Sequence, residues 1–226
     1  MKVLGRSALL LLASFGLLFL VLLSHVQLVS YSVAYYQSEF EKLGQPQELG
    51  TSIDQLALFS RQTTRYLRGL ETEPNVRLVL YGQERWLLNS KEIAHMQDVQ
   101  KLFRLARLVT AAGLALVLLL VLVAWRRGNW RPLLRFLALA ASCSLLLGIG
   151  LGWLISRDFT SVFDSFHLLV FTNDLWQLNP MEDQLINLLP EQFFAEAAFL
   201  AVWRSGLTLL ALALASGFAS RRPINP

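Results

Sequence analysis

Four long blocks of apolar residues, separated by polar stretches, limit the folds open to this chain. A helix needs about 20 apolar residues to cross the hydrocarbon core of a bilayer, because each residue rises by only about 1.5 Å. Only 16% of the residues are charged, against about 25% in ordinary soluble domains. We therefore expect an all-α membrane protein that forms a single membrane domain over residues 1–226, with transmembrane helices over about 7–30, 105–125, 133–155 and 197–220.

The first block could also be read as a signal peptide. It follows Lys2 and Arg6, and Ser32-Val33-Ala34 resembles a cleavage site. Its apolar run is longer than the roughly 7–15 residues that are usual in signal peptides. We interpret the block as an uncleaved transmembrane helix.

The charges are distributed as in an oriented membrane protein. All acidic residues lie in the stretches 31–104 and 156–196, outside the apolar blocks. Basic residues are retained on the cytoplasmic side of membranes, so both termini are predicted to be cytoplasmic and the two acidic stretches to form structured extracytoplasmic loops. This pattern does not indicate a nucleic-acid partner. Eight of the twenty basic residues flank the apolar blocks: Lys2, Arg6, Arg126, Arg127, Arg131, Arg135, Arg221 and Arg222.

Arg204 is an exception, because it falls several residues inside the fourth block. A charge within a membrane span is a functional candidate by default. It could equally extend to the outer headgroups or pair with a carboxylate of an outer loop.

The first outer loop is too rich in aromatic and leucine residues to be a solvated linker. Residues 51–70 are predicted to form a helix, and residues 76–86 a short extended pair around Gly82. A further helix is expected from Lys91 onward, continuing into the second span, with Ser90 as its cap.

Each outer loop carries one histidine with an aspartate three residues away. His95 and Asp98 are neighbours on one face of the expected helix. If residues 163–175 are helical, His167 shares a stripe with Asp164, Phe171 and Asp174. The expected topology brings both loops to the same membrane face.

A histidine beside a carboxylate is suited to proton transfer near neutral pH. Two such pairs could supply a base and an acid, although each histidine could simply belong to an ordinary interfacial helix. Two histidines with aspartates could also bind a metal, but His95 and His167 lie in separate loops without a compact ligand motif. The single cysteine, Cys143, excludes a redox pair and a zinc ribbon. We expect no metal site.

Three segments of the chain resemble one family of bacterial integral membrane proteins, the lipoprotein intramolecular transacylases. Two are short and lie in the first loop: Tyr66-Leu67-x-Gly69 and Asn89-x-x-Glu92-Ile93-x-His95-Met96-x-Asp98-Val99. The third is long and specific: Phe166-His167-x-x-x-Phe171-x-Asn173-Asp174-x-Trp176-x-Leu178-x-Pro180-x-x-Asp183-x-Leu185-Ile186-x-Leu188-Leu189-Pro190-x-x-Phe193-Phe194.

The resemblance implies an enzyme of the bacterial cytoplasmic (inner) membrane whose active face is extracytoplasmic. Its partners would be membrane lipid and lipoproteins whose N-terminal cysteine carries a diacylglyceryl group. It would move the sn-2 acyl chain to the cysteine α-amine and leave a lyso-form lipoprotein, without a soluble cofactor. The two functional histidines of the family carry over onto His95 and His167.

We add a hypothesis about the roles of these histidines and of the neighbouring residues. His167, positioned by Asp164 or Asp174, would take a proton from the amine, and His95, positioned by Asp98, would protonate the leaving glycerol oxygen, or these roles could be reversed. Candidates for binding the oxyanion or the substrate are Asn173, Arg107, Arg204, Phe171 and Trp176. The alternatives are a non-enzymatic membrane scaffold that binds lipid or lipoprotein and, behind it, a metal-dependent hydrolase.

Overall fold

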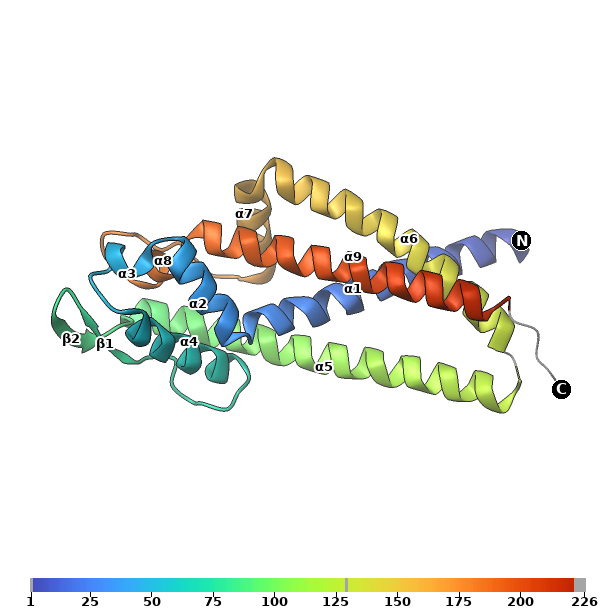
Figure 1. The fold of residues 1–226 in the computed structure, drawn as a ribbon, viewed down its shortest axis with the longest axis horizontal. Coiled ribbons are helices and arrows are strands. Elements are labelled where there is room, and N and C mark those ends of the chain that lie inside the picture. Colours follow the sequence, from blue (N-terminus) through green and yellow to red (C-terminus); the bar gives the residue numbers. More distant parts are fainter. Residues whose placement is uncertain (1, 129, 222–226) are drawn as a thin grey trace. The chain divides into compact units, whose positions relative to one another are not determined.

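The computed structural model of the chain describes residues 2–128 and 130–221, most of them helical (Figure 1). Four of the described helices are long and apolar enough to cross a membrane, as the four apolar blocks predict. Arg222, used above to orient the chain, lies outside the described residues. The long helices are α1 (Lys2–Ser30), α5 (Ser90–Arg126), α6 (Trp130–Arg157) and α9 (Glu191–Ala219).

The chain folds into two compact units. The first, which we call the helical unit, comprises Met1–Val26, Leu108–Arg157 and Phe199–Pro226. The second, which we call the loop unit, comprises Gln27–Arg107 and Asp158–Ala198. Both predicted outer loops fall within the loop unit, apart from Ser156 and Arg157 at the start of the second.

Small residues allow close contacts between the helices of the helical unit. A Cβ atom on Gly113 of α5 would lie 2.8 Å from the Leu20 side chain of α1, and one on Gly152 of α6 would lie 3.2 Å from Val202 of α9. The Ser144 hydroxyl of α6 donates a hydrogen bond to the Ser14 carbonyl of α1 at 2.7 Å. Close backbone approach and hydrogen bonds between helices take the place of the hydrophobic effect within a bilayer.

The loop unit has a hydrophobic core of its own. Phe40 of α2 (Val33–Lys42) is fully buried against Phe59 of α4 (Ile53–Leu67) and Phe193 at the start of α9. Tyr35 of α2 donates a hydrogen bond to the Phe193 carbonyl at 2.8 Å. The elements of this unit, besides the ends of the long helices, are α2 (Val33–Lys42), α3 (Gln45–Glu48), α4 (Ile53–Leu67), β1 (Arg77–Leu80), β2 (Gln83–Trp86), α7 (Phe159–Val170) and α8 (Leu185–Leu188).

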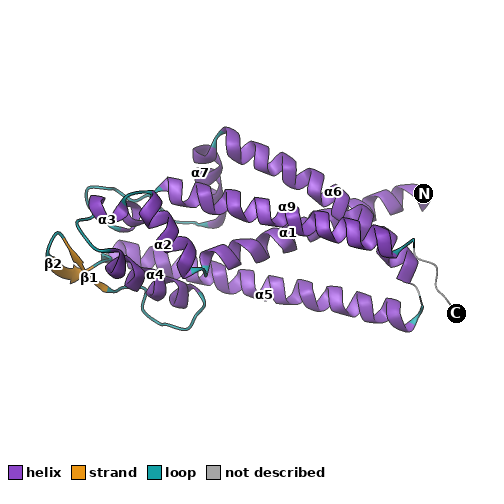
Figure 2. Cartoon of the chain, in the orientation of Figure 1, coloured by secondary structure: helices purple, strands orange, loops and turns teal. Residues whose placement is uncertain are grey.

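The extended pair expected around Gly82 is a hairpin of β1 and β2 (Figure 2). Its strands are antiparallel, with Leu80 opposite Gln83. Tyr81 and Gly82 both have positive φ angles, of 52° and 78°. This combination is typical of a tight two-residue turn that matches the twist of its strands. The predicted helix over 51–70 is also found, as α4, with the Ser52 hydroxyl accepting a hydrogen bond from the Gln55 N–H at its start.

One local prediction is wrong: Asn89, and not Ser90, caps α5, because its side-chain oxygen accepts the Glu92 N–H at 3.0 Å. The condition of a helix over 163–175 is not met, because α7 runs from Phe159 to Val170 and ends where Phe171 adopts an extended conformation. Asp174 therefore does not share a helical stripe with His167.

Helix α5 is longer than a bilayer span requires. Its 37 residues correspond to about 55 Å, against a hydrocarbon core of about 30 Å. The first part of the helix, up to Arg107, belongs to the loop unit. This part, which includes His95, lies outside the apolar span and carries the charged residues Lys91, Glu92, Asp98, Lys101 and Arg104.

Candidate active site

His95 lies on the second turn of α5, just after a reciprocal cap. The Asn89 side chain accepts the Glu92 N–H, and the Glu92 carboxylate accepts the Asn89 N–H at 2.7 Å. Such a pairing satisfies two of the four N–H groups that a helix leaves free at its start. His95 follows Glu92 by three residues and lies on the same side of the helix.

His167 lies near the end of α7, whose start is capped by Asp158. The Asp158 carboxylate accepts the Ser161 N–H at 3.0 Å. Nδ1 of His167 is 2.7 Å from the Phe163 carbonyl oxygen. A carbonyl only accepts hydrogen bonds, so Nδ1 carries the proton and the Nε2 lone pair of the neutral ring is available as a base.

The fold brings the two histidines together inside a group of aromatic rings. The imidazole centroids of His95 and His167 are 6.3 Å apart, and both side chains are buried, with 7% and 8% of their surface exposed. Phe171 contacts both rings, at 5.3 Å from His95 and 5.6 Å from His167. Trp176 stacks on His167 at 4.8 Å, and Phe163 lies 4.3 Å from it.

These surroundings keep His95 neutral. Burial lowers the pKa of His95 to about 4, and the charges of His167 and Lys91 act in the same direction while Asp98 opposes them. Among the described residues, the buried Nδ1 atom of His95 has no hydrogen-bond partner. At neutral pH His95 is therefore an uncharged imidazole with one ring nitrogen unpaired.

Asp98 is paired differently from the prediction. Its carboxylate accepts hydrogen bonds from Lys101 and from Asn173, each at 2.9 Å. These two donors lower the pKa of the Asp98 carboxyl. Asp98 thus fixes Asn173 of the second loop to α5, and it acts on His95 only through its charge.

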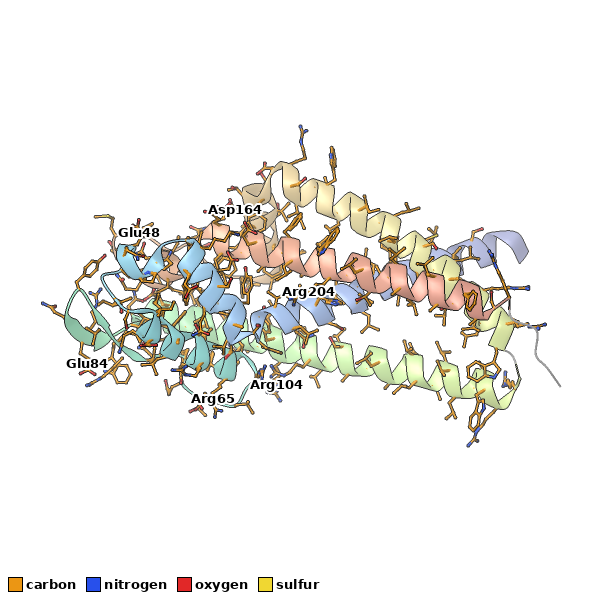
Figure 3. All side chains as sticks on the ribbon, in the orientation of Figure 1. Glu48, Arg65, Glu84, Arg104, Asp164 and Arg204 are labelled. Atoms are coloured by element: carbon orange, nitrogen blue, oxygen red, sulfur yellow. The ribbon has the colours of Figure 1, made fainter. Side chains whose placement is uncertain are left out.

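The two carboxylates expected to position His167 do not do so. Asp164 lies on the exposed side of α7 (Figure 3). Asp174 is also exposed, and its side chain lies 3.4 Å from the Gln177 amide. The Phe163 carbonyl takes the orienting role instead, because α7 is too short to carry Asp174.

The two candidate arginines are placed as follows. Nη1 of Arg107 donates to the Leu67 carbonyl at the end of α4 and to the Tyr31 hydroxyl. This arginine therefore satisfies backbone and side-chain acceptors of the loop unit. Arg204 is exposed on α9 and belongs to the helical unit (Figure 3), so its role at the site stays a prediction.

Sequence reasoning missed a buried polar network beside the histidines. Asp183, 2% exposed, accepts hydrogen bonds from the Asn89 side chain at 2.7 Å, from the Asn179 N–H at 2.7 Å and from Lys91 at 3.2 Å. Burial alone would raise the pKa of the Asp183 carboxyl, but these donors lower it below its usual range. Asn89, Glu92 and Asp183 appear in the segments quoted above, yet a polar residue in an irregular loop gives no periodic signal of being buried.

This arrangement suits the transfer of a proton between two groups of one bound molecule. It offers an oriented base at His167 Nε2 and a second, neutral imidazole at His95. Among the residues that the structure describes, no three histidine, cysteine or carboxylate side chains gather closely enough to hold a metal ion.

Comparison with known proteins points to one family. The sequence model of the family "Lipoprotein intramolecular transacylase Lit" matches residues 11–194. The structure is similar to that of the membrane-integral Lit protein from Bacillus cereus, with a TM-score of 0.74 and 21% identity over 98% of this chain and 99% of the other.

Two further structures of the Bacillus cereus protein carry a substitution of one histidine. The form with arginine in its place has a TM-score of 0.67 and 19% identity, over 96% of this chain and 94% of the other. The form with alanine has the same score and identity, over 96% of both chains. A search of curated proteins gave no match.

Proposed function

This chain belongs to the lipoprotein intramolecular transacylase family, and from that premise we propose that it moves the sn-2 acyl chain of a diacylglyceryl-cysteine lipoprotein to the lipoprotein's own α-amine. The product is a lyso-form lipoprotein with an N-acylated cysteine. The reaction takes place at the extracytoplasmic face of a bacterial cytoplasmic membrane and needs no soluble cofactor, because donor and acceptor belong to one molecule.

The observation that carries the proposal is the pairing of two buried histidines at 6.3 Å, one with an oriented lone pair. An ester-to-amide transfer must take a proton from the attacking amine and give one to the departing oxygen. Histidine is the side chain best suited to both steps near pH 7.

The steps balance without any added reactant. The amine nitrogen attacks the sn-2 carbonyl carbon as Nε2 of His167 accepts the amine proton. The tetrahedral intermediate then loses its glycerol oxygen, which takes that proton back from the His167 imidazolium as the carbon–oxygen bond breaks. One amide bond forms and one ester bond breaks.

We assign His95 to the leaving oxygen. Its pKa of about 4 makes it a weak base but leaves it able to donate a hydrogen bond as a neutral imidazole. Asn173, held by Asp98 at 2.9 Å, is a candidate donor to the tetrahedral oxyanion. Oriented donors aimed at a developing oxyanion are among the largest contributions to catalysis.

Binding both reacting groups on one molecule lowers the barrier further. An intramolecular attack avoids much of the entropy cost of bringing two reactants together, which amounts to about 7–11 kcal/mol in favourable cases. Phe171 and Trp176, which line the histidines, would hold the substrate near them.

A second candidate function is a membrane scaffold that binds lipid or lipoprotein without chemistry. It is favoured by apolar side chains that the described structure leaves largely exposed on α7 and the following loop: Leu168, Leu169 and Met181. A scaffold of this kind would keep this surface and tolerate the loss of both histidines.

Mass spectrometry separates the two functions. A diacylglyceryl lipoprotein is produced together with this chain in a host that lacks other N-acylating enzymes, and its N-terminal lipopeptide is analysed. The transacylase gives an acylated amine and a monoacylglyceryl group at unchanged total mass. A free amine on an intact diacylglyceryl peptide, despite good expression, favours the scaffold.

A further inference from the structure

We propose that Asp183 is a positioning residue, which binds the loop after α7 to the first turn of α5 through Asn89 and Lys91 and thereby sets the relation between His167 and His95. The proposal rests on the proposed function for its catalytic consequence. The binding of the loop by Asp183 can be tested independently of the proposed function.

The loop has little regular structure to fix its own position. Between the end of α7 at Val170 and the start of α8 at Leu185, the chain forms turns and irregular segments. It carries Trp176, which stacks on His167, and Asn173, which bonds to Asp98. Its placement must therefore come from side-chain contacts with neighbouring elements.

Asp183 supplies the most extensive of these contacts. Oδ1 accepts the Asn89 side-chain amide at 2.7 Å, and Oδ2 accepts the Asn179 N–H at 2.7 Å and Lys91 at 3.2 Å. Lys91 also donates to the Gln177 carbonyl at 2.7 Å. Both carboxylate oxygens are thus occupied, and their donors come from the loop itself as well as from the start of α5.

Glu92 makes a second link between the same two segments. It is 1% exposed and accepts the Leu185 N–H with one oxygen and the Asn89 N–H with the other. Burial raises the pKa of the Glu92 carboxyl. Two buried carboxylates therefore hold the loop to the turn of α5 that precedes His95.

A buried charge is costly unless each of its oxygens is satisfied, and removing one partner of a buried pair is more disruptive than replacing both. Asp183→Asn turns one acceptor atom into a donor that faces the Asn89 amide. The two donors repel each other, and the loop loses its link to Asn89, one of the contacts that hold it to α5.

The chain offers a matched repair for this substitution. In the double variant Asn89→Asp with Asp183→Asn, the new amide at position 183 again faces an acceptor, because the amide and the carboxylate have exchanged places. The remaining oxygen at position 183 still accepts Lys91 and the Asn179 N–H. Aspartate caps a helix as well as asparagine does, and the net charge is unchanged.

The experiment compares the full chain, the single variant and the double variant in lipid nanodiscs. Single-turnover rates are measured on a synthetic diacylglyceryl-cysteine peptide, and hydrogen–deuterium exchange is measured for residues 172–189. Asp183→Asn is expected to slow product formation by about 10²-fold, the effect of misplacing a catalytic group by about 1 Å. It should also speed exchange in this segment, and the double variant should reverse both changes.

A control variant separates positioning from general loss of stability. Leu78→Ala removes a fully buried side chain of β1 in the same unit and lowers thermal stability without touching the network. If Asp183 is a positioning residue, Asp183→Asn turns over much more slowly than Leu78→Ala when the two variants are compared at the same loss of thermal stability.

Three outcomes would overturn the proposal: a rate in Asp183→Asn that follows stability alone, unchanged exchange in residues 172–189, or no recovery in the double variant. If the unaltered chain itself forms no product, the proposed function fails. The loop-binding role of Asp183 then stands or falls on the exchange data, which do not depend on turnover.

Discussion

His95 and His167 come from different helices of the loop unit, and their imidazole rings lie 6.3 Å apart with Phe171 in contact with both. Neither ring is bonded to the aspartate that lies nearest in sequence. His167 is oriented by a backbone carbonyl, and His95 is kept neutral by its surroundings. The tertiary fold, together with the loop that packs over the two histidines, therefore determines how their rings are placed.

Replacing either histidine should abolish the reaction. His95→Ala and His167→Ala are each expected to form no lyso-form product, because no other described group is placed to carry the amine proton or to donate a hydrogen bond to the departing oxygen. The measurement is mass spectrometry of the lipopeptide at matched expression. His25→Ala is the control, since His25 lies on α1 in the helical unit, bonded to the Val21 carbonyl. Full activity of His95→Ala or His167→Ala would refute the proposed catalytic role of the two histidines.

His95 should stay neutral across the physiological range. Its pKa of about 4 lies below the usual value of about 6.5. The unfolded chain therefore binds more protons than the folded one between these values, and stability falls as the pH drops through this window. NMR of ¹³C-labelled histidine should show one ring, assigned by its loss in His95→Gln, that does not titrate between pH 5 and 8. A titration midpoint near pH 6.5 for the His95 ring would show that burial does not lower its pKa.

Trp176 should matter through its stacking on His167. Trp176→Phe keeps an aromatic face and is expected to reduce the single-turnover rate mildly, while Trp176→Ala should reduce it by about tenfold or more. Aromatic pairs of this kind contribute about 0.5–1.5 kcal/mol beyond their burial, and loss of the ring also frees His167 to turn. Equal single-turnover rates in Trp176→Phe and Trp176→Ala would show that stacking of an aromatic ring on His167 does not contribute to the rate.

The aromatic core of the loop unit should dominate its stability. Phe40 is fully buried among Tyr36, Phe59 and Phe193. Phe40→Ala is expected to cost about 3–5 kcal/mol of unfolding free energy. Thermal unfolding in detergent, with the exposed Leu70→Ala as a control, checks this expectation. Similar melting temperatures for Phe40→Ala and Leu70→Ala would show that the aromatic cluster around Phe40 does not dominate the stability of this unit.

The sequence was informative where the physical signal is periodic or long. Four apolar blocks predicted four spans, and Gly82 in the middle of residues 76–86 predicted the extended pair that forms the hairpin. The two histidines stood out because each lies in an outer loop with an aspartate three residues away. Membership of the family was indicated by a long, specific motif.

The remaining features depend on contacts between distant segments. Asp98 was expected to serve His95 because it lies one helical turn away, but Lys101 and Asn173 compete for its oxygens. Asp164 and Asp174 were assigned to His167 on a helix that ends too early, at Val170. Asp183 could not be recognised as buried, because its donors come from α5 and from its own irregular loop.

The most direct test of intramolecular acyl transfer is a crossover experiment. Two diacylglyceryl-cysteine peptides of different sequence, one with a deuterated sn-2 acyl chain, are incubated together with the purified chain, and the products are analysed by mass spectrometry. We predict that the deuterated acyl group appears only on the amine of the peptide that carried it, and that His167→Ala gives no such product. Label on the amine of the other peptide, or a free fatty acid in place of an amide, would contradict it.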